Sequence, residues 1–506
     1  MTTGIHHVTA LTRRVQANVD FYAGFLGLRL VKQTAGFADA AQLHLFYGDR
    51  LGSPGSLVTF LVWEDGAQGR TGLGQVSEIA LAVPRASIGT WLTRAIAAQV
   101  PVQGPAPEFG ETVLRLKDPD GIIVKLVGAD LPAQAPLAGP DAPTRLRGVT
   151  LLTDRPEATE AFLAPFGYRF AEAEGAVRRL VSDRDVLDVR AAAGYVPGIA
   201  GAGTIDHIAL RAPSPEAVDA MQKTHGAGQE TSLHDRKYFR SLYLREPGGT
   251  LVEYASDQPG MTVDEAPDDL GKTLFVPPHD ATRAEVLRVT LPQFALPGEE
   301  RIPMRDLNFI HRFHRPENPD GSTLVLLHGT GGDETDLMPL AARIAPRATL
   351  LGVRGRSTEE GGLRWFRRLD AMRFDQDDIR AESAAFADFA AEAARAYGLD
   401  PARLAFMGYS NGANLLGAVL QLHPGVVRRA ILLRGIQVLE DAPAADLTGT
   451  EVLLTTGADD PYGRAAPALV EALRKGGAGI EAPILPTGHQ LGQQDALLAR
   501  DWLAGR

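Results

Sequence analysis

Three residues in the last hundred positions of the chain have the types and order of a nucleophile, an acid and a base. Ser410 lies in "GYSNG", between an apolar run and a helical pattern, and the flanking glycines permit a sharp strand-to-helix turn that exposes the hydroxyl. Asp460 follows an apolar run in "TTGADDP", and His489 lies in "LPTGHQLG". The order predicts that His489 takes the Ser410 proton while Asp460 fixes its tautomer. Asp459 is the alternative acid, and the Gly-x-x-Asp-Pro spacing favours Asp460.

A glycine-rich loop upstream adds groups that such a centre needs. "LLHGTGGDE" (326–334) ends an apolar run, and we expect the backbone N–H groups of Thr330 and Asn411 to form an oxyanion hole. Trp365 and Phe366 either line an acyl pocket or pack in the core, and core packing is the more ordinary role of such side chains.

Four strand-like segments repeat along the first half of the chain. "GIHHVTAL" (4–11) is echoed by "TIDHIALR" (204–211) and more faintly by "VSEIALAV" (76–83) and "LRGVTLLT" (146–153). A helix-like stretch and further strand-like segments follow each of them. Two repeats end in Pro-Asp-Gly or Pro-Gly-Gly and then alternate, which is a hairpin signal. The pattern predicts βαβββ modules.

Superposing the repeats selects a second set of chemical groups. His7 falls on His207, and Glu253 falls on Lys125. Neighbouring strand residues point to opposite faces, so the register predicts that His7 enters a shared cavity and that His6 faces the other way as a structural residue. Two imidazoles and a carboxylate on one face leave about three coordination positions open, as in non-haem Fe(II) oxygenases.

The matching positions of the second and third modules do not suit a divalent cation. They carry Glu78, Gly148 and Lys125. The chain contains no cysteine, so any metal must bind through nitrogen and oxygen. Such ligands suit Fe(II), with Mn(II) as the alternative, and do not exclude zinc.

The character of the chain changes near residue 260. A Pro-, Gly- and acid-rich stretch predicts a linker, and from residue 322 apolar runs alternate with helical patterns, as in a doubly wound parallel sheet. We therefore expect a multidomain chain: an α+β region of four βαβββ modules followed by an α/β-hydrolase domain. The expected bounds are 1–260 for that region, with modules at about 1–70, 71–140, 141–200 and 201–260, then 261–300 for the linker and 301–506 for the hydrolase domain.

Bulk composition limits the partners. The 506 residues are 44% hydrophobic and 22% charged, with a net charge of −11, which argues against nucleic acid or an anionic membrane as a partner. The N-terminus lacks a signal-peptide profile, and no run of 18 apolar residues occurs. We expect a cytoplasmic protein, and the sequence leaves homo-oligomerisation open.

Residues 1–255 resemble the vicinal oxygen chelate (glyoxalase/bleomycin-resistance) superfamily, and more narrowly its hydroquinone-type ring-cleaving dioxygenases. The resemblance rests on "GIHHVTAL", "LHLFYGDRLGSPGSLVTF" and "HDRKYFRSLYLREPGGTLVEYA". It implies that His7, His207 and Glu253 hold Fe(II), and that a small aromatic diol and O₂ are the substrates.

The same resemblance implies roles for further residues. Arg236 and Tyr243 would touch the diol or the reduced oxygen, whose negative charge Arg236 can stabilise. Some members place an acid–base histidine directly before the fourth-module ligand, where this chain has Asp206, a carboxylate that could transfer the proton. His44, in "LHLFYGD", is expected to be a structural strand residue.

Residues 300–506 resemble the phospholipase/carboxylesterase family of small α/β-hydrolases. The matching stretches are "LLHGTGGDE", "WFRRLD", "GYSNGANLL", "GADDP" and "GHQL". The resemblance implies a small ester or thioester as substrate.

Together these patterns predict a bifunctional enzyme, an Fe(II)-dependent ring-cleaving dioxygenase joined to a serine carboxylesterase active in aromatic degradation. Two alternatives stay open: a glyoxalase-like isomerase fused to a thioesterase, and a metal-free aromatic-binding module fused to an esterase. Oxygen consumption that depends on Fe(II) would distinguish the dioxygenase from the isomerase, and a protein purified without metal would favour the metal-free module.

Overall fold

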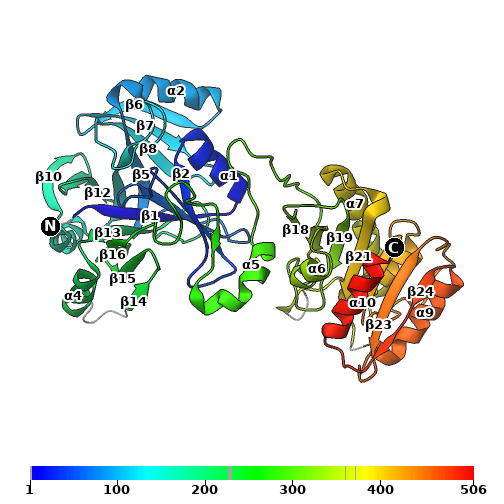
Figure 1. Ribbon diagram of the computed structural model, residues 1–506. Coiled ribbons are helices and arrows are strands. Elements are labelled where there is room, and N and C mark those ends of the chain that lie inside the picture. Colours follow the sequence, from blue (N-terminus) through cyan, green and yellow to red (C-terminus); the bar gives the residue numbers. More distant parts are fainter. Residues whose placement is uncertain (1–2, 226–230, 359–360, 371, 506) are drawn as a thin grey trace. The chain divides into compact units, whose positions relative to one another are not determined.

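The computed structural model divides the chain into two compact units (Figure 1). One consists of Met1–Ala284 and Phe294–Arg301, and the other of Glu285–Gln293 and Ile302–Arg506. No helix in the described part of the chain is long and apolar enough to cross a membrane. The residues that the structure describes are 3–225, 231–358, 361–370 and 372–505.

The first sheet of the N-terminal unit combines the first and fourth modules. Its nine strands run in the order β14-β15-β16-β13-β1-β4-β3-β2-β17. The first module supplies β1 (Ile5–Thr12), α1 (Val15–Val19), β2 (Arg29–Ala35), β3 (Leu43–Gly48) and β4 (Leu57–Val62). The fourth supplies β13 (Ile205–Ala212), α4 (Pro215–His225), β14 (Leu233–Asp235), β15 (Phe239–Arg245) and β16 (Leu251–Pro259), and β17 (Leu274–Phe275) pairs with β2.

The second sheet combines the second and third modules in the order β10-β11-β12-β9-β5-β8-β7-β6. The second module supplies β5 (Gln75–Val83), α2 (Ile88–Ala97), β6 (Val102–Glu108), β7 (Glu111–Lys117) and β8 (Ile123–Gly128). The third supplies β9 (Arg145–Thr153), α3 (Pro156–Leu163), β10 (Arg169–Glu174), β11 (Val177–Val181) and β12 (Val186–Ala191). Such curled sheets confirm the predicted α+β class.

Equivalent acids close the two hairpin turns that the repeat predicts. Asp118 accepts hydrogen bonds from the backbone N–H groups of Asp120 and Ile122. Glu246 accepts from Gly248 and Thr250, which are the corresponding positions. These turns set the register of the strands that follow them, so Lys125 and Glu253 come to matching places.

The second unit contains the predicted α/β-hydrolase sheet, in the order β18-β20-β19-β21-β22-β23-β24 with β25 beside β23. Except for β18, the strands pair in parallel, as expected where helices cover both faces. Its strands are β18 (His311–His314), β19 (Thr323–Leu327), β20 (Thr349–Val353), β21 (Leu404–Tyr409), β22 (Arg429–Leu433), β23 (Glu451–Gly457), β24 (Gly479–Glu481) and β25 (Ile484–Leu485). The helices are α5 (Ala284–Thr290), α6 (Met338–Ile344), α7 (Gln376–Tyr397), α8 (Asn411–Leu422), α9 (Ala466–Lys475) and α10 (Gln493–Ala504).

Local signals explain where the longest helix begins and ends. The Asp375 side chain accepts hydrogen bonds from the N–H groups of Asp377 and Asp378, which caps the start of α7, and Gly398, at φ 63°, ends it. The buried face of α7 includes Phe386 and packs against the sheet core.

Candidate functional site

The predicted metal ligands lie on three neighbouring strands of the first sheet. His7 is on β1, His207 on β13 and Glu253 on β16, and β13 lies between the other two. Ala209 pairs with His7 on one side and with Glu253 on the other. Cross-strand partners point to the same face, so the small side chain of Ala209 leaves room for the longer ones to meet above it.

These three side chains form a buried cluster. His7 Nε2 lies 2.9 Å and His207 Nε2 lies 3.1 Å from Glu253 Oε2, and the side chains are at most 7% exposed. Apart from these two imidazole contacts, no hydrogen bond to either carboxylate oxygen forms within the described structure. Two donors about 2.1 Å from one ion at a right angle lie about 3 Å apart. Three converging donors, with a buried carboxylate that nothing else satisfies, fit a divalent cation.

The orientation of His6 corrects the simple alternation rule. We predicted that His6 faces away from His7, but the Nδ1 atoms of the two rings lie 2.9 Å apart. The pairing of β1 with β13 is irregular between Ile5 and His7, and such a bulge re-aims side chains. His6 therefore contacts the ring nitrogen of His7 opposite the one that faces Glu253.

His207 has a comparable support. Its Nδ1 lies 2.7 Å from Asp206 Oδ2. Burial would lower the pKa of His207, but the carboxylates of Asp206 and Glu253 outweigh it and raise the pKa to about 9. Burial raises the pKa of Glu253, yet the attraction of His7 and His207 holds it well below its ordinary value. Asp206 thus contacts the ring nitrogen of His207 that faces away from Glu253, and a role of Asp206 in proton transfer stays a prediction.

Asp206→Asn is expected to weaken Fe(II) binding by about 10- to 100-fold, the usual loss for a partner that orients a metal-bound imidazole. Anaerobic metal titration measures it directly. Asp219→Asn removes an exposed carboxylate of the same module, which pairs with Arg240, and should leave the affinity unchanged. Equal affinities for the two variants would show that Asp206 does not orient His207.

Arg236 and Tyr243, which we predicted to contact the substrate, lie near this cluster. The Tyr243 ring is centred 5.3 Å from that of His207, and the Arg236 guanidinium lies 5.8 Å from the Tyr243 ring. Burial and the charge of Glu253 raise the pKa of Tyr243 well above its ordinary value, and Arg236 opposes them. Tyr243 is therefore a neutral hydrogen-bonding group beside a cation.

Two histidines nearby were undervalued from the sequence. His44 Nε2 lies 2.9 Å from Thr59 Oγ1, and burial together with His7 and His207 lowers its pKa well below the ordinary value. His234 lies 5.4 Å from the Tyr243 ring, centre to centre. His44 lies in "LHLFYGD" and His234 in "HDRKYF". Nothing in the spacing of these stretches indicated that the strands that carry them, β3 and β14, converge on the cluster.

The second sheet shows why the duplicated fold has one such cluster among its described residues. Lys125 Nζ lies 3.1 Å from Glu78 Oε2, and Arg115 Nε donates to Glu78 Oε1 at 2.8 Å. Burial opposes ionisation of Glu78, but Lys125 and Arg115 together lower its pKa to about 2. Cationic side chains thus neutralise the carboxylate at the place equivalent to the cluster.

The second unit brings the predicted triad together. His489 Nε2 lies 2.9 Å from Ser410 Oγ, and His489 Nδ1 lies 2.9 Å from Asp460 Oδ2. Ser410 connects β21 to α8 at φ 50° and ψ −110°, a strained conformation for a residue other than glycine. A Cβ at Gly408 would lie 2.6 Å from Ala413 N, and one at Gly412 would lie 2.2 Å from Leu327 O, so both glycines are sterically required.

The residues predicted to form the oxyanion hole and the acyl pocket near this triad have different positions in the structure. Asn411 begins α8, so its N–H has no acceptor within the helix, and Thr330 follows β19 in the glycine-rich loop. Their joint role as an oxyanion hole remains a prediction. Trp365 and Phe366 are fully buried in the hydrophobic core. Core packing is thus the role that the structure gives them.

A buried ion pair that the sequence did not reveal supports the histidine loop. Arg434 follows β22 and makes a two-point contact with Asp495 of α10, at 2.7 and 3.0 Å, and both side chains are fully buried. The guanidinium also donates to the carbonyls of Gly488 and Gln490, which flank His489. Arg434 therefore fixes the loop that carries the imidazole.

Asp495→Ala is expected to lower the free energy of unfolding by about 3–5 kcal/mol, because it leaves a buried guanidinium without its counter-charge. Ester hydrolysis should fall as well, since the loop around His489 loses its anchor. Denaturant unfolding measures the first effect. Asp501→Ala on the same helix removes an exposed partner of Arg500 and serves as the control. Similar stabilities of the two variants would contradict the proposed anchor.

Comparison with known proteins relates the N-terminal unit to aromatic ring cleavage. The profile of the Glyoxalase/Bleomycin resistance protein/Dioxygenase superfamily matches residues 4–126. MhqO of Bacillus subtilis (strain 168), named as a candidate ring-cleaving dioxygenase, is 36% identical over 315 residues, covering 59% of this chain and 98% of MhqO. The chlorohydroquinone/hydroquinone 1,2-dioxygenase of Sphingobium indicum is 34% identical, covering 56% of this chain and 95% of that enzyme. A solved candidate dioxygenase of Bacillus subtilis matches with 34% identity and a TM-score of 0.55, covering 58% and 98% of the two chains.

The C-terminal unit has its own relatives. MhqD of Bacillus subtilis (strain 168), named as a candidate hydrolase, is 37% identical over 183 residues, covering 36% of this chain and 92% of MhqD. A solved carboxylesterase of Mesorhizobium loti shares 50% identity, with 40% of this chain and 98% of that one covered and a TM-score of 0.39. Each half of the chain thus matches a separate protein along nearly the whole length of that protein.

Proposed function

Because the N-terminal part of the chain belongs to the Glyoxalase/Bleomycin resistance protein/Dioxygenase superfamily and is joined to a carboxylesterase-like α/β-hydrolase, we propose that the protein is a bifunctional enzyme. One centre opens the ring of a hydroquinone-type diol with O₂ in an Fe(II)-dependent reaction. The other is a serine carboxylesterase for a small ester or thioester. The observation that carries the first assignment is the convergence of His7, His207 and Glu253 on one buried point.

In the first centre, His7, His207 and Glu253 would hold the cation, with Mn(II) as the alternative to iron. A bound Fe(II) ion supplies the redox chemistry with O₂ that amino-acid side chains lack. Arg236 provides positive charge near the cluster and favours a diol that has lost a proton, as well as negative charge that develops on oxygen. The neutral Tyr243 hydroxyl can donate a hydrogen bond to the substrate.

In the second centre, the groups act as in other serine hydrolases. His489 removes the proton of Ser410 as its Oγ attacks the acyl carbonyl, and Asp460 stabilises the imidazolium. The backbone N–H groups of Thr330 and Asn411 would donate hydrogen bonds to the oxyanion. His489 then returns the proton to the leaving group, and water hydrolyses the acyl enzyme, which frees the acid and regenerates the Ser410 hydroxyl.

The decisive test for the first centre is anaerobic loading with Fe(II), followed by O₂ uptake with a panel of hydroquinones and catechols. We expect uptake with hydroquinones that depends on added iron and yields a ring-opened product. Isomerisation of a hemithioacetal without O₂ uptake would favour a glyoxalase-like enzyme. Aromatic binding with no metal retained would favour the metal-free module.

A further inference from the structure

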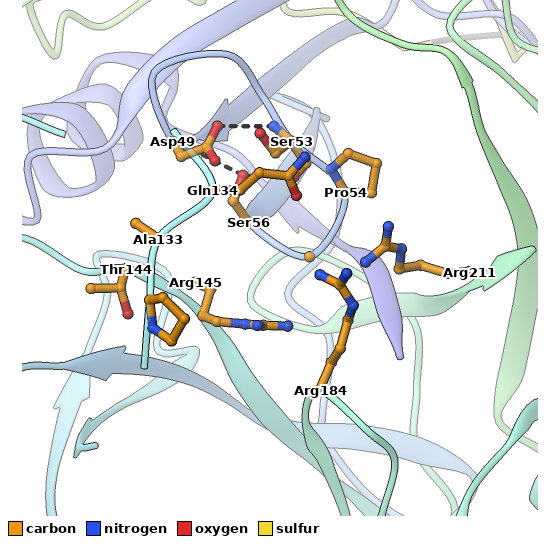
Figure 2. A pocket seen from close by; sticks show the side chains of 12 residues that line it. Asp49, Ser53, Pro54, Ser56, Ala133, Gln134, Thr144, Arg145, Arg184 and Arg211 are labelled. Atoms are coloured by element: carbon orange, nitrogen blue, oxygen red, sulfur yellow. Dashed lines mark hydrogen bonds between the residues drawn. The ribbon is translucent and has the colours of Figure 1, made fainter. Parts of the chain in front are cut away.

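A cavity of about 290 Å³ lies in the N-terminal unit, and three arginines line it (Figure 2). Arg145 begins β9, Arg184 lies between β11 and β12, and Arg211 belongs to β13. The loop 53–56 of the first module closes one side. All four modules or their connections therefore contribute, and no single module contains the site.

The guanidinium groups are directed toward the same space, as Figure 2 shows. Within the described chain, no carboxylate lies at ion-pair distance from Arg145 or Arg184, and Arg145 Nε is buried without a hydrogen-bond partner. Arg211 is 7% exposed and donates to Asp257 through Nε and Nη2, while its Nη1 is buried without a partner. Two cations are thus left without a paired anion, beside a third that has a free donor.

The acids close to these arginines are engaged elsewhere. Asp49 accepts hydrogen bonds from the N–H groups of Leu51, Ser53 and Ala135. Asp185 accepts from the N–H of Ile5 and the hydroxyl of Tyr168. Their lone pairs satisfy the protein's own donors, so neither acid neutralises the cavity at ion-pair distance.

Like charges that lie close together repel one another when no anion lies between them. Burial and the charges of Arg184 and Arg211 lower the pKa of Arg145, against the attraction of Asp185. Backbone at Gly55, at φ 90°, approaches the same group, since a Cβ there would lie 3.8 Å from Arg145 Nη2. A bound anion with two negative charges would neutralise the unpaired guanidinium groups of Arg145 and Arg184, and it could accept from the buried donors of Arg145 and Arg211 that have no partner.

We propose that this cavity binds a small dianion, either a phosphate group or a short dicarboxylate, through Arg145, Arg184 and Arg211. Planar guanidinium groups donate pairs of hydrogen bonds to the oxygens of both classes. This site differs in its residues from the cluster of His7, His207 and Glu253, because none of its three arginines is a predicted metal ligand or substrate contact.

Calorimetry on the full-length protein tests the proposal with inorganic phosphate and with succinate as probes, at constant ionic strength so that general screening does not contribute. We expect saturable binding of at least one probe and a higher unfolding temperature in its presence. Arg145→Gln and Arg184→Gln should each weaken binding by about tenfold or more, as expected for loss of a charge-assisted contact. Arg190→Gln, at an exposed position on β12, is the matched control and should bind normally.

Phosphate binding alone would identify a phosphate-bearing ligand, and succinate binding alone a dicarboxylate. Binding of both supports the general dianion site. The proposal is overturned if neither probe binds below about 10 mM, or if both arginine variants retain the affinity of the control. The unfolding temperature of each ligand-free variant reports whether it folds, and the exposed Arg184 can be replaced without disturbing the core.

Discussion

Ser410→Ala is expected to lower the kcat for p-nitrophenyl acetate hydrolysis by about 10⁶-fold, the loss seen when a serine hydrolase loses its nucleophile. The Ser410 hydroxyl lies 2.9 Å from His489 Nε2, the position of a nucleophile whose proton the imidazole can remove. Oxygen uptake with methylhydroquinone should be unaffected, because His7, His207 and Glu253 belong to the other unit.

Ser322→Ala is the matched control for this measurement. Ser322 precedes β19, at the end of a parallel strand opposite to the edge where the triad lies, so its loss should leave ester hydrolysis intact. Loss of both activities in Ser410→Ala would contradict independent centres. Retention of ester hydrolysis would assign that reaction to other residues.

His7→Ala is expected to abolish stoichiometric Fe(II) binding and to lower iron-dependent O₂ uptake by more than about 100-fold, which exceeds the loss typical of a residue that only supports a ligand. Removal of one of three donors leaves His207 and Glu253, and two donors do not define a facial triad. Iron content after anaerobic loading measures the first effect, and an oxygen electrode the second.

His279→Ala provides the comparison, since this exposed histidine lies in the same unit and outside the cluster. It should retain iron and O₂ uptake, and both variants should hydrolyse p-nitrophenyl acetate normally. Unchanged iron content in His7→Ala would refute the proposed ligand set even if the esterase assignment holds.

The two sheets of the N-terminal unit illustrate how duplication permits division of roles. One half keeps two histidines and a glutamate, whereas the other places Lys125 beside Glu78 at the equivalent point. An ammonium group supplies there the positive charge that a buried carboxylate requires. The duplicated architecture can thus remain stable when one half alone carries the candidate metal ligands.

Much of the architecture was accessible from the sequence because its signals are local or repeated. The four repeats of one strand-like segment predicted modules, and their superposition placed His7, His207 and Glu253 together from the sequence alone. The glycines around Ser410 predicted a sharp turn. At such a turn the backbone passes so close to its neighbours that larger side chains would clash. The spacing of apolar residues and the alignment of the repeats can both be taken from the sequence, and they determine which side chains share a face of a strand.

Tertiary structure alone decided the features that depend on irregular pairing or on contacts between distant segments. A bulge in β1 turned His6 toward His7, against the alternation that a regular strand would impose. Arg434 meets Asp495 across 61 positions, and the three cavity arginines come from two different modules. A side chain's type shows which interactions it can make, but only the packed fold determines which partner reaches it and whether water is excluded.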